Sequence, residues 1–342
     1  MLEKTRVTLH DVAALAGVSH QTVSRVINKS GNVRPETKDR VNAAILELGY
    51  RPNAIARSMV RGITRTLGCI SPNLTDPVFT RIIESAQTEA RRQGFFILIG
   101  TASSVGEVKP LLDELLNRRV DGLIAINARD DDRYELLCDL NRTGPPIVYV
   151  KNSAGEDPVS AVCCDDIQGG YLITKHLLEL GHRKIAVILG RENEQCTRER
   201  LEGYRMALND HGLSASENMI IQGNWDSESG REAAAQLLKD PESFTAIFAL
   251  NDRMAFGAIR GLQEAGCHVP KDYSVVGYDN SPLASLIDPP LTTIEQPLDL
   301  FGQQAAAILI DQVLNGELKP VEVCAQPKLI VRDSSAGVKP MP

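Results

Sequence analysis

Five polar side chains near the N-terminus have the types and the spacing of groups that contact DNA bases. His20, Gln21, Ser24, Arg25 and Asn28 lie at offsets of 0, 1, 4, 5 and 8, which places them on one face of a helix. Amide and guanidinium groups presented by a helix form hydrogen bonds with base edges in the major groove. The alternative interpretation is an ordinary helical hairpin, in which the same residues form a solvated face.

Two short helices position this face. The first places four apolar residues inward at helical spacing: Leu9, Val12, Ala13 and Ala16. Gly17 and Val18 form a tight corner, and Ser19 is a natural N-cap for the second helix. A third amphipathic helix, Arg34 to Leu48, ends at Gly49 and completes a small core. The pattern is that of a helix-turn-helix.

The N-terminal region is basic and the rest of the chain is acidic. Residues 1–65 hold 11 Lys and Arg against 5 Asp and Glu, whereas the whole chain has a formal charge of −7. Within this region, residues 50–62 have a helical composition and carry Arg51, Arg57 and Arg61. Positive charge confined to one end is typical of a region that binds phosphates, and it also fits a solvated surface.

From Arg65 onward, short apolar runs alternate with amphipathic helices. Nine runs are predicted as strands: Leu67–Ile70, Phe95–Ile99, Gly122–Ile126, Ile147–Val150, Val159–Cys163, Ile185–Leu189, Met219–Ile221, Ala246–Ala249 and Ser274–Tyr278. The predicted helices are Val78–Gln93, Lys109–Asn117, Asp131–Asn141, Gln168–Leu180, Arg198–His211, Ser227–Lys239, Asp252–Ala265 and Leu298–Leu314. Such alternation is typical of parallel sheets covered on both faces, and this length favours two lobes.

The composition bears on location and cofactors. The seven cysteines are scattered, odd in number and without the close pairing of a zinc site. We expect reduced thiols in a cytoplasmic protein, with no metal and no cofactor. The adjacent Cys163 and Cys164 are expected as buried strand residues, the alternative being an oxidant sensor. No apolar run approaches the ~18 residues of a membrane helix, and no signal-like apolar region precedes the first helix.

Motifs along nearly the whole chain resemble the LacI/GalR family of bacterial transcription regulators. In the N-terminal region they are Asp11-Val12-Ala13, Ala16-Gly17-Val18-Ser19, Thr22-Val23-Ser24-Arg25-Val26 and Tyr50-Arg51-Pro52-Asn53. In the remainder they are residues 121–124, 180–186, 198–204, 249–252, 274–279 and 290–294.

The resemblance implies an α/β fold in three parts. Residues 1–51 are expected to form an all-α helix-turn-helix headpiece, residues 52–64 a hinge helix or linker, and residues 65–342 a body for effector binding and dimerisation. The body is expected to be two-lobed, like a periplasmic binding protein, with parallel sheets. Its first lobe would span about 65–164 and 292–323, and its second about 165–291 and 324–342.

The same resemblance implies a sequence-specific transcription regulator. We expect a repressor whose homodimer binds a near-palindromic DNA operator and responds to a sugar or sugar derivative held between the lobes. Met59 stands where many members insert a leucine into the minor groove. The implied DNA contacts are Thr8, Ser19, His20, Gln21, Thr22, Ser24, Arg25, Asn28, Asn53, Ala56 and Met59.

Other functions remain as alternatives. One is a corepressor-dependent or activating regulator of the same family. A cytoplasmic sugar-binding protein or an enzyme has less support, because the sequence has no nucleophile elbow, phosphate-binding glycine loop or metal-ligand cluster. Gly169-Gly170 lacks the further glycine of a dinucleotide motif, so close helix packing explains it better.

Polar residues that follow the predicted strands are the expected effector contacts, because ligands bind beyond the carboxyl ends of parallel strands. Arg200 matches the arginine that bridges effector oxygens in the family, and Asn251 is expected to contact the ligand while Asp252 caps a helix. Trp225 stands where the lactose repressor has its sugar-stacking tryptophan, although a structural role is the alternative. The full expected set is Asp76, Phe79, Lys151, Arg200, Trp225, Asn251, Asp279 and Gln296.

Lys151 departs from the family pattern. Family members commonly have an acidic residue after the strand that ends at Val150, where this chain has Lys151-Asn152. A cation that faces the cavity would favour a ligand with a carboxylate or a phosphate. The alternative is a solvated lysine.

Overall fold

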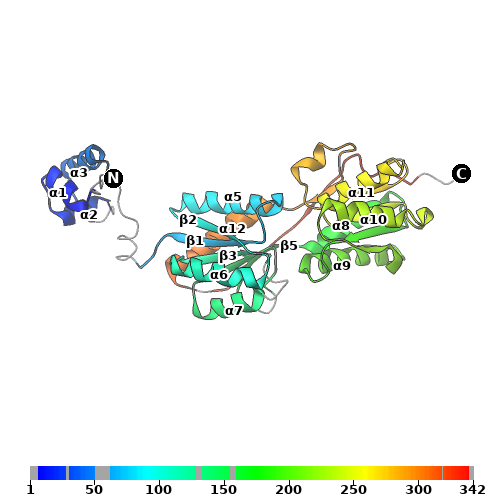
Figure 1. The fold of residues 1–342 in the computed structure, drawn as a ribbon, viewed down its shortest axis with the longest axis horizontal. Helices are drawn as coiled ribbons and strands as arrows, with labels where there is room; N and C mark the ends of the chain where they lie inside the picture. The colour runs from blue at the N-terminus through cyan, green and yellow to red at the C-terminus, as the bar shows by residue number, and fades with distance from the viewer. Residues whose placement is uncertain are drawn as a thin grey trace. The chain divides into compact units, whose positions relative to one another are not determined.

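The computed structural model describes residues 7–27, 31–50, 62–127, 133–154, 159–317 and 319–338. Residue contacts divide the chain into two units, Met1–Thr64 and Arg65–Pro342 (Figure 1). Four of the expected DNA contacts, Asn28, Asn53, Ala56 and Met59, lie outside the described residues, as does most of the expected hinge.

The first unit is built from three helices, α1 (Leu9–Ala16), α2 (His20–Ile27) and α3 (Pro35–Leu48). One fully buried valine from each helix meets in its core: Val12, Val23 and Val41. Its helix ends are capped as the sequence predicts. The Thr22 amide donates to Ser19 Oγ at 3.2 Å, and Gly17 takes the left-handed conformation after α1, which a residue with a side chain rarely adopts.

The first sheet of the second unit has six parallel strands in the order β11-β5-β4-β3-β1-β2. Helices α5 and α12 cover one face of this sheet, and α6 and α7 lie on the other (Figure 1). The strands are β1 (Thr66–Ser71), β2 (Phe96–Thr101), β3 (Gly122–Ile126), β4 (Ile147–Val150), β5 (Ser160–Cys164) and β11 (Glu322–Ala325). The helices are α5 (Pro77–Arg92), α6 (Val105–Asn117), α7 (Arg133–Thr143) and α12 (Leu298–Asn315).

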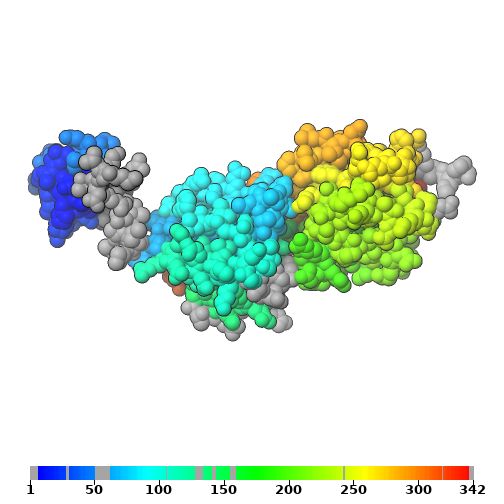
Figure 2. All heavy atoms as spheres, in the orientation of Figure 1, coloured from blue at the N-terminus to red at the C-terminus, as the bar shows by residue number. Residues whose placement is uncertain are grey.

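The second sheet has four parallel strands in the order β7-β6-β8-β9. They are β6 (Ile185–Leu189), β7 (Ile220–Gln222), β8 (Ala246–Ala249) and β9 (Ser274–Val276). Around it pack α8 (Asp166–Glu179) with α9 (Gln195–Asp210), and α10 (Ser227–Leu237) with α11 (Asp252–Glu264). The two sheets form the two lobes of the body, which appear as separate masses in the space-filling view (Figure 2).

Three crossings connect the lobes. The first follows β5. The second runs through β10 (Thr293–Glu295), which pairs antiparallel with β12 (Lys328–Ile330). The third lies between β11 and β12. Two boundaries between the lobes differ slightly from the expected residues 292 and 323. Thr292 still bridges Val276 of the second sheet, and the first sheet extends to Ala325 through its pairing with β5.

Candidate functional site

The polar face that the sequence predicts on α2 is present in the first unit. His20, Gln21 and Arg25 are exposed, while Thr22 and Ser24 are half-buried. The side chains of Thr8 and Ser19 are exposed too, but their hydroxyls accept backbone amides of Asp11 and Thr22 and so also hold the helix ends. The exposed face therefore has an imidazole, an amide and a guanidinium within the first two turns of a helix, which suits the edges of base pairs.

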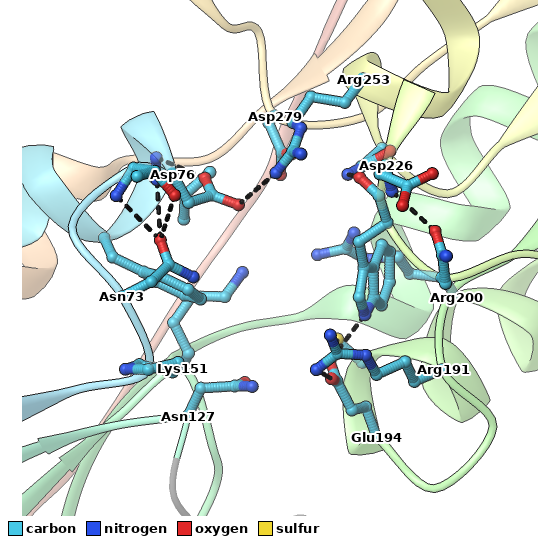
Figure 3. A pocket seen from close by; sticks show the side chains of 18 residues that line it. Asn73, Asp76, Asn127, Lys151, Arg191, Glu194, Arg200, Asp226, Arg253 and Asp279 are labelled. Atoms are coloured by element: carbon cyan, nitrogen blue, oxygen red, sulfur yellow. Dashed lines mark hydrogen bonds and ion pairs between the residues drawn. The ribbon is translucent and has the colours of Figure 1, made fainter. Parts of the chain in front are cut away.

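A cavity of about 310 Å³ lies between the two lobes of the body (Figure 3). Its lining comes from segments that follow β1, β3 and β4 of one sheet and β6, β7, β8 and β9 of the other. These are the carboxyl ends of parallel strands, where the fold predicts a ligand site. Among its lining residues are Asn73, Asp76, Phe79, Asn127, Lys151, Arg191, Glu194, Arg200, Asn224, Trp225, Asp226, Asn251, Arg253 and Asp279.

Backbone strain is concentrated at this cavity. Seven non-glycine residues of the described chain have positive φ, and four of them line the cavity: Asn127, Lys151, Trp225 and Asp279. Non-glycine residues rarely adopt such φ values, because the Cβ atom crowds the backbone. Strain of this kind persists where the surrounding structure fixes the residue, often at a functional site.

Arg200 lies at the back of the cavity in a fully buried ion pair. Its Nε donates to Asp166 Oδ1 at 2.8 Å, and each side chain is 2% exposed. The guanidinium also lies 3.6 Å from the ring centroid of Tyr278, a cation–π contact. Burial raises the pKa of Asp166, but Arg200 and Lys151 outweigh it and bring the pKa below its ordinary value. The pair is therefore charged and fixed before any ligand arrives.

Trp225 lines the cavity and is also held by the protein. Its indole N–H donates to Glu194 Oε2 at 2.9 Å, and its ring lies so close to Gly190 that a Cβ there would come within 1.9 Å of it. The two roles considered for Trp225 are thus compatible. Contacts on one side fix the ring, and the half-buried remainder faces the cavity.

Lys151, Gln296 and Asp279 form a hydrogen-bonded chain beside the cavity. Lys151 Nζ donates to Gln296 Oε1 at 2.7 Å, and Gln296 Nε2 donates to Asp279 Oδ1 at 2.6 Å. Lys151 is 8% exposed, so the solvated alternative is wrong. The expectation for Gln296 needs correction as well: it is 3% exposed, does not line the cavity, and uses its amide to connect two residues that do.

The helix cap predicted for Asp252 is formed by Asn251 instead. Asn251 is the N-cap of α11, because its Oδ1 accepts the Met254 amide at 2.8 Å and its Nδ2 donates to the Trp225 carbonyl. Asn251 still lines the cavity, but these bonds hold its amide. Asp252 does not cap the helix. Its carboxylate accepts from Thr293 Oγ1 and from the Ser281 amide.

Asp76 and Arg253 connect the two lobes across the cavity. Their side chains form an ion pair with 3.6 Å between Arg253 Nη1 and Asp76 Oδ2 (Figure 3). Asp76 also caps α5 by accepting the Val78 amide. The sequence pattern indicated Asp76 but not Arg253, because an arginine in the first turn of a helix has the pattern of a surface residue.

Other polar lining residues also follow strands, as the sequence predicts, although they were not in the set of expected contacts. Asn73, Asn127, Arg191, Glu194, Asn224 and Asp226 all follow strands of the two sheets. Within the described residues there is no group of three or more His, Cys, Asp or Glu able to hold a metal ion. Nor does the described part of the chain contain a helix of the length and apolarity that a membrane span requires.

Comparisons with known proteins agree with this architecture. Residues 8–53 match the family model described as bacterial regulatory proteins, lacI family, and residues 64–332 match periplasmic binding proteins and sugar binding domain of LacI family. Over 96% of this chain and 98% of the relative, the sequence is 36% identical to the HTH-type transcriptional repressor PurR of Vibrio atlanticus. It is 37% identical to the HTH-type transcriptional regulator CelR of Thermobifida fusca, over 98% of this chain and 100% of that relative.

Two solved structures extend the comparison. The lac repressor dimer bound to operator and the anti-inducer ONPF has a TM-score of 0.88 at 31% identity, over 97% of this chain and all of that one. The CelR–cellobiose complex has a TM-score of 0.75 at 36% identity, over 96% of this chain and all of that one. The matched family models and the relatives identify a DNA-binding transcription regulator with a ligand-binding body. The chain belongs to the LacI family.

Proposed function

We propose that this chain is a homodimeric transcriptional repressor that binds a near-palindromic operator and is controlled by a sugar or sugar derivative in the interlobe cavity. The observation that carries the proposal is the polar cavity at the carboxyl ends of both sheets, with Trp225 and Phe79 as apolar surfaces. Carboxylates and amides suit sugar hydroxyls, and aromatic rings suit the CH face of a pyranose. A repressor that acts on DNA works in the cytoplasm of a bacterium.

The DNA-binding side rests on the exposed face of α2. His20, Gln21 and Arg25 would contact bases, Thr22 and Ser24 would support them, and the headpiece hydroxyls of Thr8 and Ser19 would contact phosphates. Because one headpiece makes few contacts, tight binding requires two on a symmetric site. The relatives include a PurR repressor and a CelR regulator, and the lac repressor was solved as a dimer on its operator.

Effector control rests on the two-lobed body. A ligand that contacts both lobes favours one relative arrangement of the lobes, and it shifts DNA affinity by no more than its differential affinity for the two states, typically ~1–3 kcal/mol. The Asp76–Arg253 ion pair already connects the lobes and lies at the cavity. A ligand bound there either replaces this ion pair or adds further contacts between the lobes.

The test is a DNA-binding titration. The full chain and labelled DNA from its own promoter region are titrated by fluorescence anisotropy at low salt, with and without a panel of sugars. We expect specific binding and an effector that changes the affinity. A decrease with the sugar identifies an inducer, and an increase identifies a corepressor. If specific DNA is bound no more tightly than random DNA of the same length, the proposal is wrong.

A further inference from the structure

Lys151, a buried cation at the cavity, differs from the three arginines that also line it. Arg191 lies 3.7 Å from Glu194, Arg200 lies 2.8 Å from Asp166, and Arg253 lies 3.6 Å from Asp76, so each arginine has a carboxylate partner. Lys151 also lines the cavity, yet its hydrogen-bond partner in the described chain is the neutral amide of Gln296.

The amide of Gln296 is fixed in this orientation. A lysine ammonium only donates, so the amide oxygen must face Lys151, and the amide nitrogen then faces Asp279. Asp279 is thus held apart from Lys151 by an intervening side chain rather than paired with it. An ammonium has three N–H donors, and Gln296 accepts one of them.

A charge that is nine-tenths buried and unpaired is costly, because burial removes most of its hydration. Lys151 is 8% exposed, and its backbone has φ of 77°, which places the residue in a strained conformation beside the cavity. A bound anion restores the lost interaction with a charge-assisted hydrogen bond, which is stronger than a bond to a neutral hydroxyl.

We propose that the effector carries an anionic group, a carboxylate or a phosphate, which binds Lys151 Nζ, while its hydroxyls contact the polar residues of both lobes. This inference rests on the proposed function and specifies its ligand as an acidic sugar derivative. The neighbouring Asn73 and Asn127 lie on the same side of the cavity as Lys151, where their amides add neutral polar groups around the anion (Figure 3).

The test uses pairs of sugars that differ by one charge. Isothermal titration calorimetry of the full chain compares glucuronate with glucose, galacturonate with galactose, and glucose 6-phosphate with glucose. We expect at least one anionic member to bind about tenfold or more tightly than its neutral partner. Equal affinities, tighter binding of every neutral member, or no binding by any anionic member would overturn the proposal.

Two variants then assign the preference to Lys151. Lys151→Met keeps the length of the side chain and the same backbone strain, and it should abolish the preference for the anion. Gln296→Glu provides Lys151 with a carboxylate from the protein, and it should have the same effect without removing the cation. Lys175→Met, on the exposed side of α8 at 45% side-chain exposure, is the control and should change nothing.

The outcomes separate this inference from the proposed function. A preference that survives in both variants contradicts the role of Lys151, and Gln296→Glu decides the matter if Lys151→Met does not fold. Operator binding is measured on the same preparations. Specific operator binding without any anion preference refutes this inference alone, whereas anion preference without operator binding refutes the proposed function alone.

Discussion

The backbone of Gly170 lies directly against the backbone of Arg200: a Cβ on Gly170 would come within 2.2 Å of the Arg200 carbonyl oxygen. Gly203 has the same relationship with Ile167, at 2.0 Å. The two glycines allow α8 and α9 to pack closely, which brings Asp166 and Arg200 together behind the cavity. Close helix packing, and not a dinucleotide motif, is the role of Gly170.

The first prediction follows from this contact. Gly170→Ala should destabilise the body by about 1–3 kcal/mol, because the new methyl group meets backbone that can move only by separating two helices. Gly106→Ala is the matched control: Gly106 is also helical, and nothing lies within 4 Å of its Cβ position. That variant should be neutral or slightly stabilising. Urea unfolding measures both, and equal free energies of unfolding would contradict the packing argument.

A second prediction concerns the buried ion pair. Asp166→Asn leaves Arg200 buried without its carboxylate and should cost about 3–5 kcal/mol of unfolding free energy at neutral pH. The folded state lowers the pKa of Asp166, so its contribution is present above the ordinary value of 3.8 and is lost as pH falls through the folded pKa. Asp299→Asn breaks an ion pair with Arg81 that is more than half exposed, and it should cost less than about 1 kcal/mol.

A third prediction concerns His182, which connects strands of the second lobe to the C-terminal segment. Its ring contacts Thr245, Ser274 and the Ala336 carbonyl, and burial lowers its pKa below 6.5. Its stabilisation is therefore present above pH 6.5 and is lost as pH falls below that value.

The measurement compares wild type with His182→Gln by thermal unfolding at several pH values. The stability advantage of the wild type should shrink between about pH 7.5 and pH 5.5. Burial raises the pKa of Asp279, which makes stability fall as pH rises, the opposite of the effect of His182. Because Asp279 is present in both proteins, the difference between their stabilities isolates the contribution of His182. A difference that stays constant with pH would show that His182 does not titrate in this range.

A fourth prediction tests the DNA-reading face. Arg25→Ala should weaken specific operator binding by about 1–3 kcal/mol and bring specific and random DNA closer in affinity. Arg118→Ala, in the body at 61% side-chain exposure, should leave both affinities unchanged. Anisotropy titrations at several salt concentrations separate a base contact from a phosphate contact, since loss of a phosphate contact also lowers the salt dependence.

A fifth prediction links pH to the proposed anionic effector. Burial raises the pKa of Asp279 to about 7; Arg200 and Lys151 oppose this shift, while Asp252 and Asp76 add to it. Because an ionised Asp279 repels an anion at Lys151, affinity for the acidic sugar should fall as pH rises through about 7, with proton uptake on binding. Asp279→Asn should remove this dependence of affinity on pH. Calorimetry in two buffers of different ionisation enthalpy measures the number of protons taken up on binding. The same titrations with the neutral sugar of each pair give the pH dependence that does not involve the anion.

Much of the fold could be predicted because most of its strands are continuous apolar runs bounded by polar residues. All nine predicted strands are present, and four, such as Ile185–Leu189, have the expected limits. The strands β10, β11 and β12 were missed, because three or four residues that mix polar and apolar types give no periodic signal. These short strands nevertheless lie in or next to two of the three crossings.

The position of the site could be predicted, but not the role of each side chain. The topology of parallel sheets predicts a ligand site at the strand ends, which indicated Lys151 and Asp279, and the family resemblance indicated Arg200 and Trp225. All four line the cavity. Whether Asn251 faces a ligand depends on the Trp225 carbonyl, which comes from a distant segment and is invisible in a local pattern. The same holds for Gln296, whose partners Lys151 and Asp279 come from different lobes.

The crossings also determine the order in which a nascent chain can complete its parts. The headpiece precedes the body in the sequence and so leaves the ribosome before it, and most of the second lobe lies in one stretch between β5 and β10. The first lobe, although its synthesis begins earlier, needs α12 to cover β3, β4 and β5. The part of its apolar sheet that α12 covers therefore stays exposed until the second lobe and α12 have been translated, and in that interval it is open to chaperones and to aggregation.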